Sequence, residues 1–211
     1  MHTPPVFRLE DPEAIDALVR EVGLATLVGA RDDGALEVTH VPLVLRRGPG
    51  DEATLLGHVA RASGTWRVLD GRPVTAVFQG PHAYVSAATY TSPADQVPTW
   101  NYVVVHAEGT LRTTTGKELR ADLEALVGTF EGPAPRWSLG TIRPELLAEL
   151  EAGIVGVRVE VTRITAKAKV SQNRSPEDRA RVRAMLAARG DTASLALVAQ
   201  MEAAEARSVS R

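Results

Sequence analysis

The stretch IVGVRVEVTRI, residues 154–164, decides the fold class of this chain. Its valines alternate with glycine, arginine, glutamate and threonine, which predicts a strand with one buried face. In the rest of the sequence, apolar runs bounded by turn residues predict further strands at 24–28, 36–45, 54–60, 74–78, 84–86, 101–107 and 109–113. Many short strands with few helices between them favour a mostly antiparallel barrel over a βαβ sheet, so the class is α+β.

Helices are expected at the periphery of this barrel. Asp11 suits an N-cap and Pro12 a first helical position, and apolar spacing continues the helix to Gly23. Ser175 and Pro176 form a second capping signature. Together with apolar periodicity, these signals predict helices at 12–22, 119–130, 144–150, 176–189 and 192–206. The last two would form a C-terminal helical pair.

The strand at 36–45 contains an irregularity at His40-Val41-Pro42. Apolar residues before His40 share one phase of the alternation, and those from Val41 onward share the other. Proline is tolerated in strands chiefly at edges and bulges. The sequence therefore predicts a bulge that re-aims His40.

The amino-acid composition limits which classes of protein this chain can belong to. The 211 residues are 44 % apolar and 24 % charged, which is typical of a folded globular chain. The absence of cysteine excludes disulfides and thiolate ligands, and it suits a reducing compartment. No apolar run approaches ~18 residues, so no membrane span is expected. The N-terminus lacks a secretory signal pattern, so a cytoplasmic location is predicted.

Charge is unevenly distributed along the chain. The net charge of −2 argues against a general nucleic-acid binder. Residues 163–189 nevertheless hold eight basic residues against two acids, so the remainder carries −8. This basic stretch would suit a phosphate, a nucleic acid or the acidic face of the rest of the protein.

Polar and aromatic residues gather in four clusters, at 39–42, 57–66, 78–106 and 169–175. Aromatic residues near turns often line ligand sites, although they would equally fill a barrel core. Arg61 and Lys169 suit a phosphate, and the amides of Gln172 and Asn173 suit a flavin ring edge. A solvated linker is the alternative for residues 169–174. No histidine pair has HxH or HxxxH spacing, so no metal site is predicted.

Signatures of common enzyme classes are missing from the sequence. It contains no GxSxG, no Walker A loop and no GxGxxG. Carboxylates are not concentrated in the four clusters, so a general acid/base pair has no obvious members.

The clusters together carry a resemblance to a known family. The strings MHTPPVFRLED (1–11), GHVARAS (57–63), VFQGPHAYVS (77–86), VPTWNYVVVHAEG (97–109) and KVSQNRSPEDR (169–179) follow in order. In this order they resemble the PaiB family, described as FMN-binding negative regulators of transcription. The resemblance runs from residue 1 to about residue 183. Ser63 departs from it, since asparagine is expected there.

The resemblance implies an FMN-binding split β-barrel that forms a homodimer with the flavin between subunits. The implied domains are a flavin-binding barrel with the N-terminal helix at 1–166, and a basic loop with the helical pair at 167–211. Phosphate contacts are implied for Arg61, Ser63, Lys169 and Ser171. Contacts to the ring or its pocket are implied for His40, Gln79, Tyr84, Trp100, Asn101, Gln172 and Asn173. Haem is the alternative cofactor, since related split barrels bind it.

Three functions follow from this reading. The first is an FMN-binding transcriptional regulator, with a DNA or protein partner. The helix expected at 192–206 contains no Lys or Arg and carries Glu202 and Glu205, so it is a poor DNA-reading element. The second is a flavin-dependent oxidoreductase or flavin reductase, with His40, Tyr84 and His106 as proton-transfer candidates. The third is a protein that sequesters flavin or haem.

Overall fold

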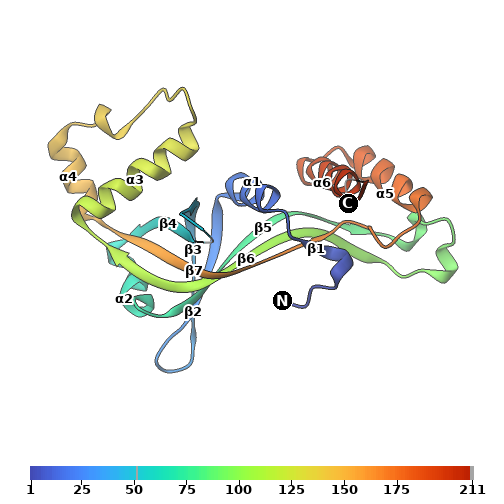
Figure 1. The fold of residues 1–211 in the computed structure, drawn as a ribbon, viewed down its shortest axis with the longest axis horizontal. Coiled ribbons are helices and arrows are strands. Elements are labelled where there is room, and N and C mark those ends of the chain that lie inside the picture. The colour runs from blue at the N-terminus through green and yellow to red at the C-terminus, as the bar shows by residue number, and fades with distance from the viewer. Residues whose placement is uncertain (51, 210–211) are drawn as a thin grey trace. The chain divides into compact units, whose positions relative to one another are not determined.

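The computed structural model describes residues 1–50 and 52–209. Figure 1 traces the chain through them. The strands are β1 (Arg8–Leu9), β2 (Leu24–Ala30), β3 (Leu36–Arg47), β4 (Ala53–Ala60), β5 (Pro73–Val85), β6 (Thr99–Thr114) and β7 (Ile154–Lys169). The α-helices are α1 (Pro12–Val22), α2 (Thr65–Leu69), α3 (Gly116–Glu131), α4 (Pro144–Ala152), α5 (Pro176–Arg189) and α6 (Thr192–Val209).

The strands form one sheet that closes on itself. Their order is β1-β7-β4-β3-β2-β5-β6, and β6 also pairs with β7. Strands β2 to β7 therefore complete a ring, and β1 lies outside it against β7. The pairs β1–β7, β2–β3, β2–β5, β3–β4 and β4–β7 are antiparallel. The predicted α+β class and the antiparallel barrel are confirmed.

The chain divides into two compact units. The barrel unit consists of Asp16–Phe78 and His106–Ile164, and the terminal unit of Met1–Ile15, Gln79–Val105 and Thr165–Arg211. Strands β5, β6 and β7 each run from one unit into the other. The predicted division into residues 1–166 and 167–211 stays a prediction.

The predicted bulge at His40-Val41-Pro42 is wrong. Strand β3 pairs with β2 without interruption, from Ala30 opposite Leu36 to Leu24 opposite Pro42. Its partner then changes, because Leu43 opposite Gly57 begins the ladder with β4. The phase of burial shifts at this change of partner, where Leu43 and the residue after it are both buried.

Gly57 is needed at this change of partner. A Cβ placed there would lie 2.6 Å from the carbonyl oxygen of Pro42, which is backbone and cannot move aside cheaply. Gly109 is needed for the same reason in β6, since its Cβ would lie 2.1 Å from the carbonyl oxygen of Glu160. The sequence predicted separate strands at 74–78 and 84–86 and at 101–107 and 109–113, whereas β5 and β6 are each continuous across these gaps.

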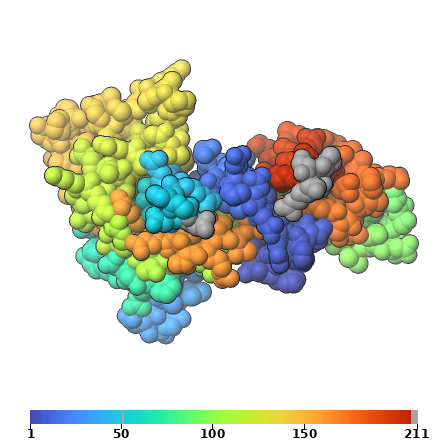
Figure 2. Space-filling view, in the orientation of Figure 1, coloured from blue at the N-terminus to red at the C-terminus, as the bar shows by residue number. Residues whose placement is uncertain are grey.

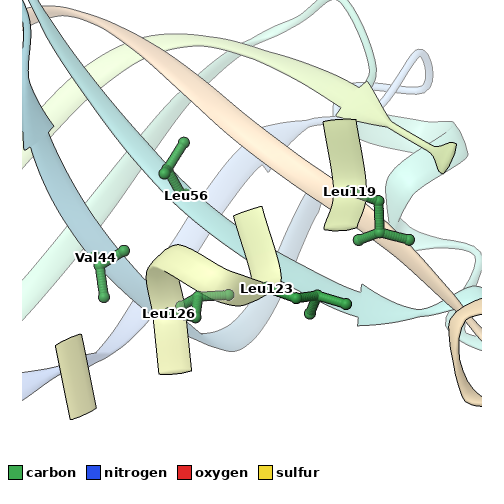
Figure 3. Packing of buried hydrophobic residues seen from close by; sticks show 5 residues of the cluster. All are labelled: Val44, Leu56, Leu119, Leu123 and Leu126. Atoms are coloured by element: carbon green, nitrogen blue, oxygen red, sulfur yellow. The ribbon is translucent and has the colours of Figure 1, made fainter. Parts of the chain in front are cut away.

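Helix α3 covers part of the barrel in the barrel unit. Leu119, Leu123 and Leu126 on one face of α3 pack against Val44 of β3 and Leu56 of β4 (Figure 3). The spacing of the three leucines is the apolar periodicity that predicted this helix. Burial of such aliphatic side chains stabilises the fold by about 1.5–3 kcal/mol each.

A buried ion pair lies beside this apolar cluster. Asp122 of α3 is 1 % exposed, and Arg158 of β7 donates to it through Nε (2.9 Å) and Nη2 (2.7 Å). The hydroxyl of Thr114 also donates to Asp122, at 2.9 Å. Arg158 makes a second ion pair with Glu118, at 2.6 Å. The carboxylate of Asp122 is thus fully satisfied although it is out of water.

In the terminal unit, helices α5 and α6 lie against each other, and the loop between β5 and β6 meets α5 (Figure 2). Ser175 caps α5 by accepting from the backbone N–H of Asp178 at 3.1 Å, as the sequence predicted. Asp178 in turn accepts from the backbone N–H of Thr91 at 2.8 Å. One carboxylate therefore ties the loop that precedes β6 to the start of α5.

This tie makes stability depend on pH. The hydrogen bond from the backbone of Thr91 lowers the pKa of Asp178, so the folded state holds this proton less tightly than the unfolded state. The contribution is complete above the unfolded pKa of about 4 and is lost as pH falls through the folded pKa. In urea unfolding, wild type is expected to be more stable than Asp178→Asn at pH 7, with the difference shrinking below about pH 4. A difference that stays constant with pH would show that the carboxylate is not what ties the loop.

Candidate functional site

Five Lys and Arg side chains of the terminal unit make no ion pair with a carboxylate among the described residues, and three of them, Lys167, Lys169 and Arg174, lie at the end of β7 and in the turn after it. Lys167 donates to the carbonyl oxygen of His2 at 3.1 Å and lies 5.2 Å from the centre of the Tyr102 ring. Lys169 donates to the hydroxyl of Thr99. We call these three residues the cation cluster.

The third member of the cation cluster is also held by neutral groups. Arg174 donates to the side-chain oxygen of Gln96 and stacks over the ring of Tyr90, with its Cζ 4.5 Å from the ring centre. Neutral partners satisfy a cation's hydrogen bonds but leave its charge uncompensated. No carboxylate of the described residues lies within ion-pair distance of the cluster, and the charge of Asp178 acts on Arg174 from farther away.

The electrostatics of Lys169 agree with this description. Burial lowers the pKa of its ammonium group; Tyr102 acts in the opposite direction, and the nearby charges of Lys167 and Arg174 lower the pKa further. The three cations thus act on one another. A bound anion would reverse this shift, because an opposite charge favours the protonated form.

An exposed group of rings lies on the neighbouring strands. Trp100 is 52 % exposed and Tyr84 is 43 % exposed, and their rings meet edge to face with centres 6.1 Å apart. The ring of His82 lies 6.0 Å from that of Trp100. Trp100 and Tyr102 stand two residues apart on β6, so both project from the same face of the strand. We call His82, Tyr84 and Trp100 the aromatic face.

Two predicted site residues bind each other inside the unit. The amide of Asn101, which is 0 % exposed, donates to the hydroxyl of Ser171 at 2.9 Å. Ser171 has a φ of 68°, which is unusual for a residue with a side chain. Gln172 then accepts from the backbone N–H of Val170 at 2.8 Å and donates to the carbonyl oxygen of Ala168. These bonds fix the turn that follows Lys169.

The barrel unit holds the other predicted phosphate contacts. Arg61 donates through Nε to the carbonyl oxygen of Ala152 (2.7 Å) and through Nη2 to that of Ile154 (2.9 Å). Its guanidinium also lies 5.9 Å from the ring centre of Trp66. Ser63 donates to the carbonyl oxygen of Ala60 at 2.8 Å. Arg61 is thus another cation held by neutral groups, with N–H donors left over.

The predicted site residues therefore fall into two sets. The barrel unit contains His40, Arg61 and Ser63, and the terminal unit contains Gln79, Tyr84, Trp100, Asn101, Lys169, Ser171, Gln172 and Asn173. His40 is exposed opposite Thr26 in the β2–β3 ladder, and Gln79 contacts His82 at 3.4 Å. Asn173 is exposed in the turn before α5.

Sequence reasoning did not single out Lys167, Thr99 and Arg174 as site residues. A signal for Lys167 was present, because it stands two residues before Lys169 and a strand places both on the same face. No sequence signal identifies Thr99 as the partner of Lys169, since 70 residues separate them.

The basic stretch 163–189 is engaged within the chain. All eight of its cations contact other groups of the protein: Arg163 with Glu108; Lys167 with His2; Lys169 with Thr99; Arg174 with Gln96; Arg179 and Arg183 with Glu205; Arg181 with Glu177; and Arg189 with the carbonyl oxygen of Tyr84. The α5 arginines are paired largely with acids, whereas the cation cluster is not.

Between residues 1 and 50 and between 52 and 209, no three His, Asp or Glu side chains converge as metal ligands. Over the same residues, no helix has the length and apolar character needed to cross a bilayer.

Comparison with solved structures shows the fold. The chain is similar to the FAD and heme binding protein from Mycobacterium smegmatis, with a TM-score of 0.58 and 20 % identity over 82 % of this chain and 78 % of that one. It is also similar to the flavocytochrome Anf3 from Azotobacter vinelandii, with a TM-score of 0.59 and 16 % identity over 85 % and 78 %. The predicted split-barrel fold is confirmed.

Comparison of sequences shows the family. Residues 1–163 match the family described as "Putative FMN-binding domain". The chain is 33 % identical over 180 residues to the protease synthase and sporulation protein PAI 2 of Bacillus subtilis, covering 84 % of this chain and 85 % of that protein. It is 28 % identical over 203 residues to an uncharacterized protein of Aspergillus fumigatus, covering 74 % and 78 %. The chain therefore belongs to the PaiB-like family of FMN-binding domains.

Proposed function

We propose that this protein binds FMN and that the cation cluster receives the FMN phosphate. The observation that carries the proposal is that Lys167, Lys169 and Arg174 meet only neutral partners at hydrogen-bond distance. A phosphate monoester carries a charge of about −1.5 to −2 at neutral pH and three strong acceptor oxygens. It would supply the counter-charge that the cluster lacks. Arg61 of the barrel unit, whose partners are also neutral, is proposed separately as an anion contact of that unit.

The aromatic face is proposed to receive the isoalloxazine ring. Trp100 and Tyr84 expose large aromatic surfaces, which soluble proteins commonly use for ligands or partners. When bound, FMN supplies one- and two-electron redox chemistry. Asn101 and Ser171 hold β6 to the turn after β7, and so they support Trp100 and Lys169. We therefore assign them a positioning role.

We infer that the protein acts as a homodimer in the cytoplasm. Exposed apolar side chains in the terminal unit, namely Tyr84, Val97 and Trp100, support a partner surface there. The lack of cysteine suits a reducing compartment. We further propose that the protein serves as a negative regulator of transcription, as the PaiB family does, through an FMN-dependent partner. The paired arginines of α5 and the acidic α6 argue against base reading by the helical pair.

Titration of FMN into the purified protein tests the flavin proposal. Flavin fluorescence is expected to change saturably with wild type. Trp100→Ala is expected to weaken binding by roughly two- to tenfold, from the loss of about 0.5–1.5 kcal/mol of ring contact, whereas Trp100→Phe should bind nearly as well.

Trp137→Ala is the matched control for this titration, because Trp137 is also exposed but belongs to the barrel unit. Its FMN affinity should equal that of wild type. The absence of saturable binding by wild type at high micromolar FMN would overturn the proposed function.

A further inference from the structure

A cavity in the terminal unit is lined by no member of the cation cluster or of the aromatic face. Its volume is about 320 Å³, and the N-terminal segment, the end of β7 and helices α5 and α6 line it. This volume lies at the lower end of the range of small-molecule sites. Every lining residue belongs to the terminal unit.

The cavity lies on the opposite face of β7 from the lysines of the cation cluster. Successive residues of a strand project to opposite sides. Lys167 and Lys169 project toward Tyr102 and Thr99, whereas Ala168 and Val170 line the cavity. The same strand end therefore presents two separate surfaces.

The floor of the cavity is apolar and well packed. Leu9, Ala168, Val170 and Met201 line it, and each of these side chains is at most 6 % exposed. Gln172 also lines it, but both ends of its amide are already bonded to backbone groups. Because these side chains are buried, the accessible apolar surface of the cavity comes from Pro5, Val6 and Ala204, which suits a hydrocarbon or aryl body.

The rim of the cavity carries charges of both signs, most of them engaged. Asp11 caps α1 by accepting from the backbone N–H of Glu13 at 3.1 Å. Glu205 accepts from both Arg179 (2.9 Å) and Arg183 (2.6 Å). Burial alone would raise the pKa of Glu205, but these two hydrogen bonds lower it, so this carboxylate stays charged between two cations.

Three arginines and three acids line the cavity, and two of the arginines, Arg179 and Arg207, lie on α5 and α6. Arg207 lines the cavity, and its guanidinium has no ion-pair partner within the described residues. Glu205, in contrast, is paired with Arg179 and Arg183. At the other wall, Arg8 meets Glu10 only at 3.8 Å, with both side chains more than half exposed. Such an exposed pair leaves Arg8 little neutralised.

We propose that this cavity is a binding site for a small amphipathic monocarboxylate. The apolar body of the ligand lies against Pro5, Val6 and Ala204, above the buried floor. Its carboxylate binds Arg207, whose planar guanidinium matches a carboxylate in bidentate fashion. The site is separate from the flavin site and joins the N-terminal segment to α6.

The test uses octanoate as the probe, titrated calorimetrically into the full-length protein. Octylamine, with the same chain and the opposite charge, is the matched ligand. Two variants address the two parts of the site. Arg207→Gln removes the cation, and Ala204→Trp fills the cavity from its wall without changing the buried floor. Arg136→Gln, at an exposed position of the barrel unit, is the matched control for loss of one arginine.

Octanoate is expected to bind wild type and the control alike, and each of the two variants should weaken it by about tenfold or more. Octylamine should bind far more weakly. Thermal melting and FMN binding like those of wild type would show that the variants are folded. The proposal is overturned if octanoate does not bind wild type at low millimolar concentration. It is equally overturned if both variants keep wild-type affinity, or if octylamine binds as tightly. FMN binding that survives any of these results leaves the proposed function standing.

Discussion

Replacement of Lys169 by methionine is expected to weaken FMN binding by about ten- to a hundredfold. A hydrogen bond to a charged group contributes about 1.5–3 kcal/mol, and each 1.4 kcal/mol changes affinity tenfold. Methionine keeps much of the apolar stem, so the change removes mainly the charge. Equilibrium titration of flavin fluorescence in the wild type and the variant measures the effect.

Lys117→Met is the charge-matched control, because Lys117 is an exposed lysine at the start of α3 in the barrel unit. Its FMN affinity should stay within about twofold of wild type. Lys169→Arg should retain most of the affinity, since it keeps the positive charge. Equal affinities for wild type and Lys169→Met would show that Lys169 does not contact the phosphate.

Asp122→Ala is expected to lower the free energy of unfolding by about 3 kcal/mol. The change leaves the charge of Arg158 on β7 and the hydroxyl of Thr114 without their buried acceptor. We place the effect at the low end of the range for broken buried pairs because Glu118 still accepts from Arg158 at 2.6 Å. Urea unfolding followed by circular dichroism measures it.

Asp16→Ala is the matched control for this second prediction. Arg47 also binds Asp16 through two nitrogens, at 3.1 and 2.7 Å, but the side chains are 37 % and 27 % exposed. Pairs of this kind contribute about 0–1 kcal/mol. If both substitutions cost the same, burial of Asp122 is not what makes its ion pair important.

Local signals made much of the fold predictable. Asp11, Pro12 and Ser175 mark helix starts through bonds within a few residues, and the structure contains those bonds. The alternation of residues 154–164 predicted a strand. Strand β7 continues beyond the predicted end to Lys169, through a stretch in which small alanines alternate with lysines. Helix α2 and strand β1 were not predicted, since five and two residues are too few for a periodic pattern.

Features that depend on distant partners were not predictable in the same way. The irregular alternation around Pro42 predicted a bulge, but its cause is a change of neighbour from β2 to β4. The sequence marked Lys169 as a phosphate ligand through its motif. It gave no sign that Lys167 would lie over Tyr102 or that Arg174 would lie over Tyr90, because these contacts form only once β6 and its preceding loop meet the end of β7.

The ratio of the riboflavin dissociation constant to the FMN dissociation constant measures directly whether the cation cluster binds the phosphate. The two ligands share the ring system and differ in the phosphate. Wild type is expected to prefer FMN by about tenfold or more, and a Lys167→Met, Lys169→Met double variant should bring the ratio close to one. Equal affinity of wild type for riboflavin and FMN would show that the cation cluster does not bind the phosphate.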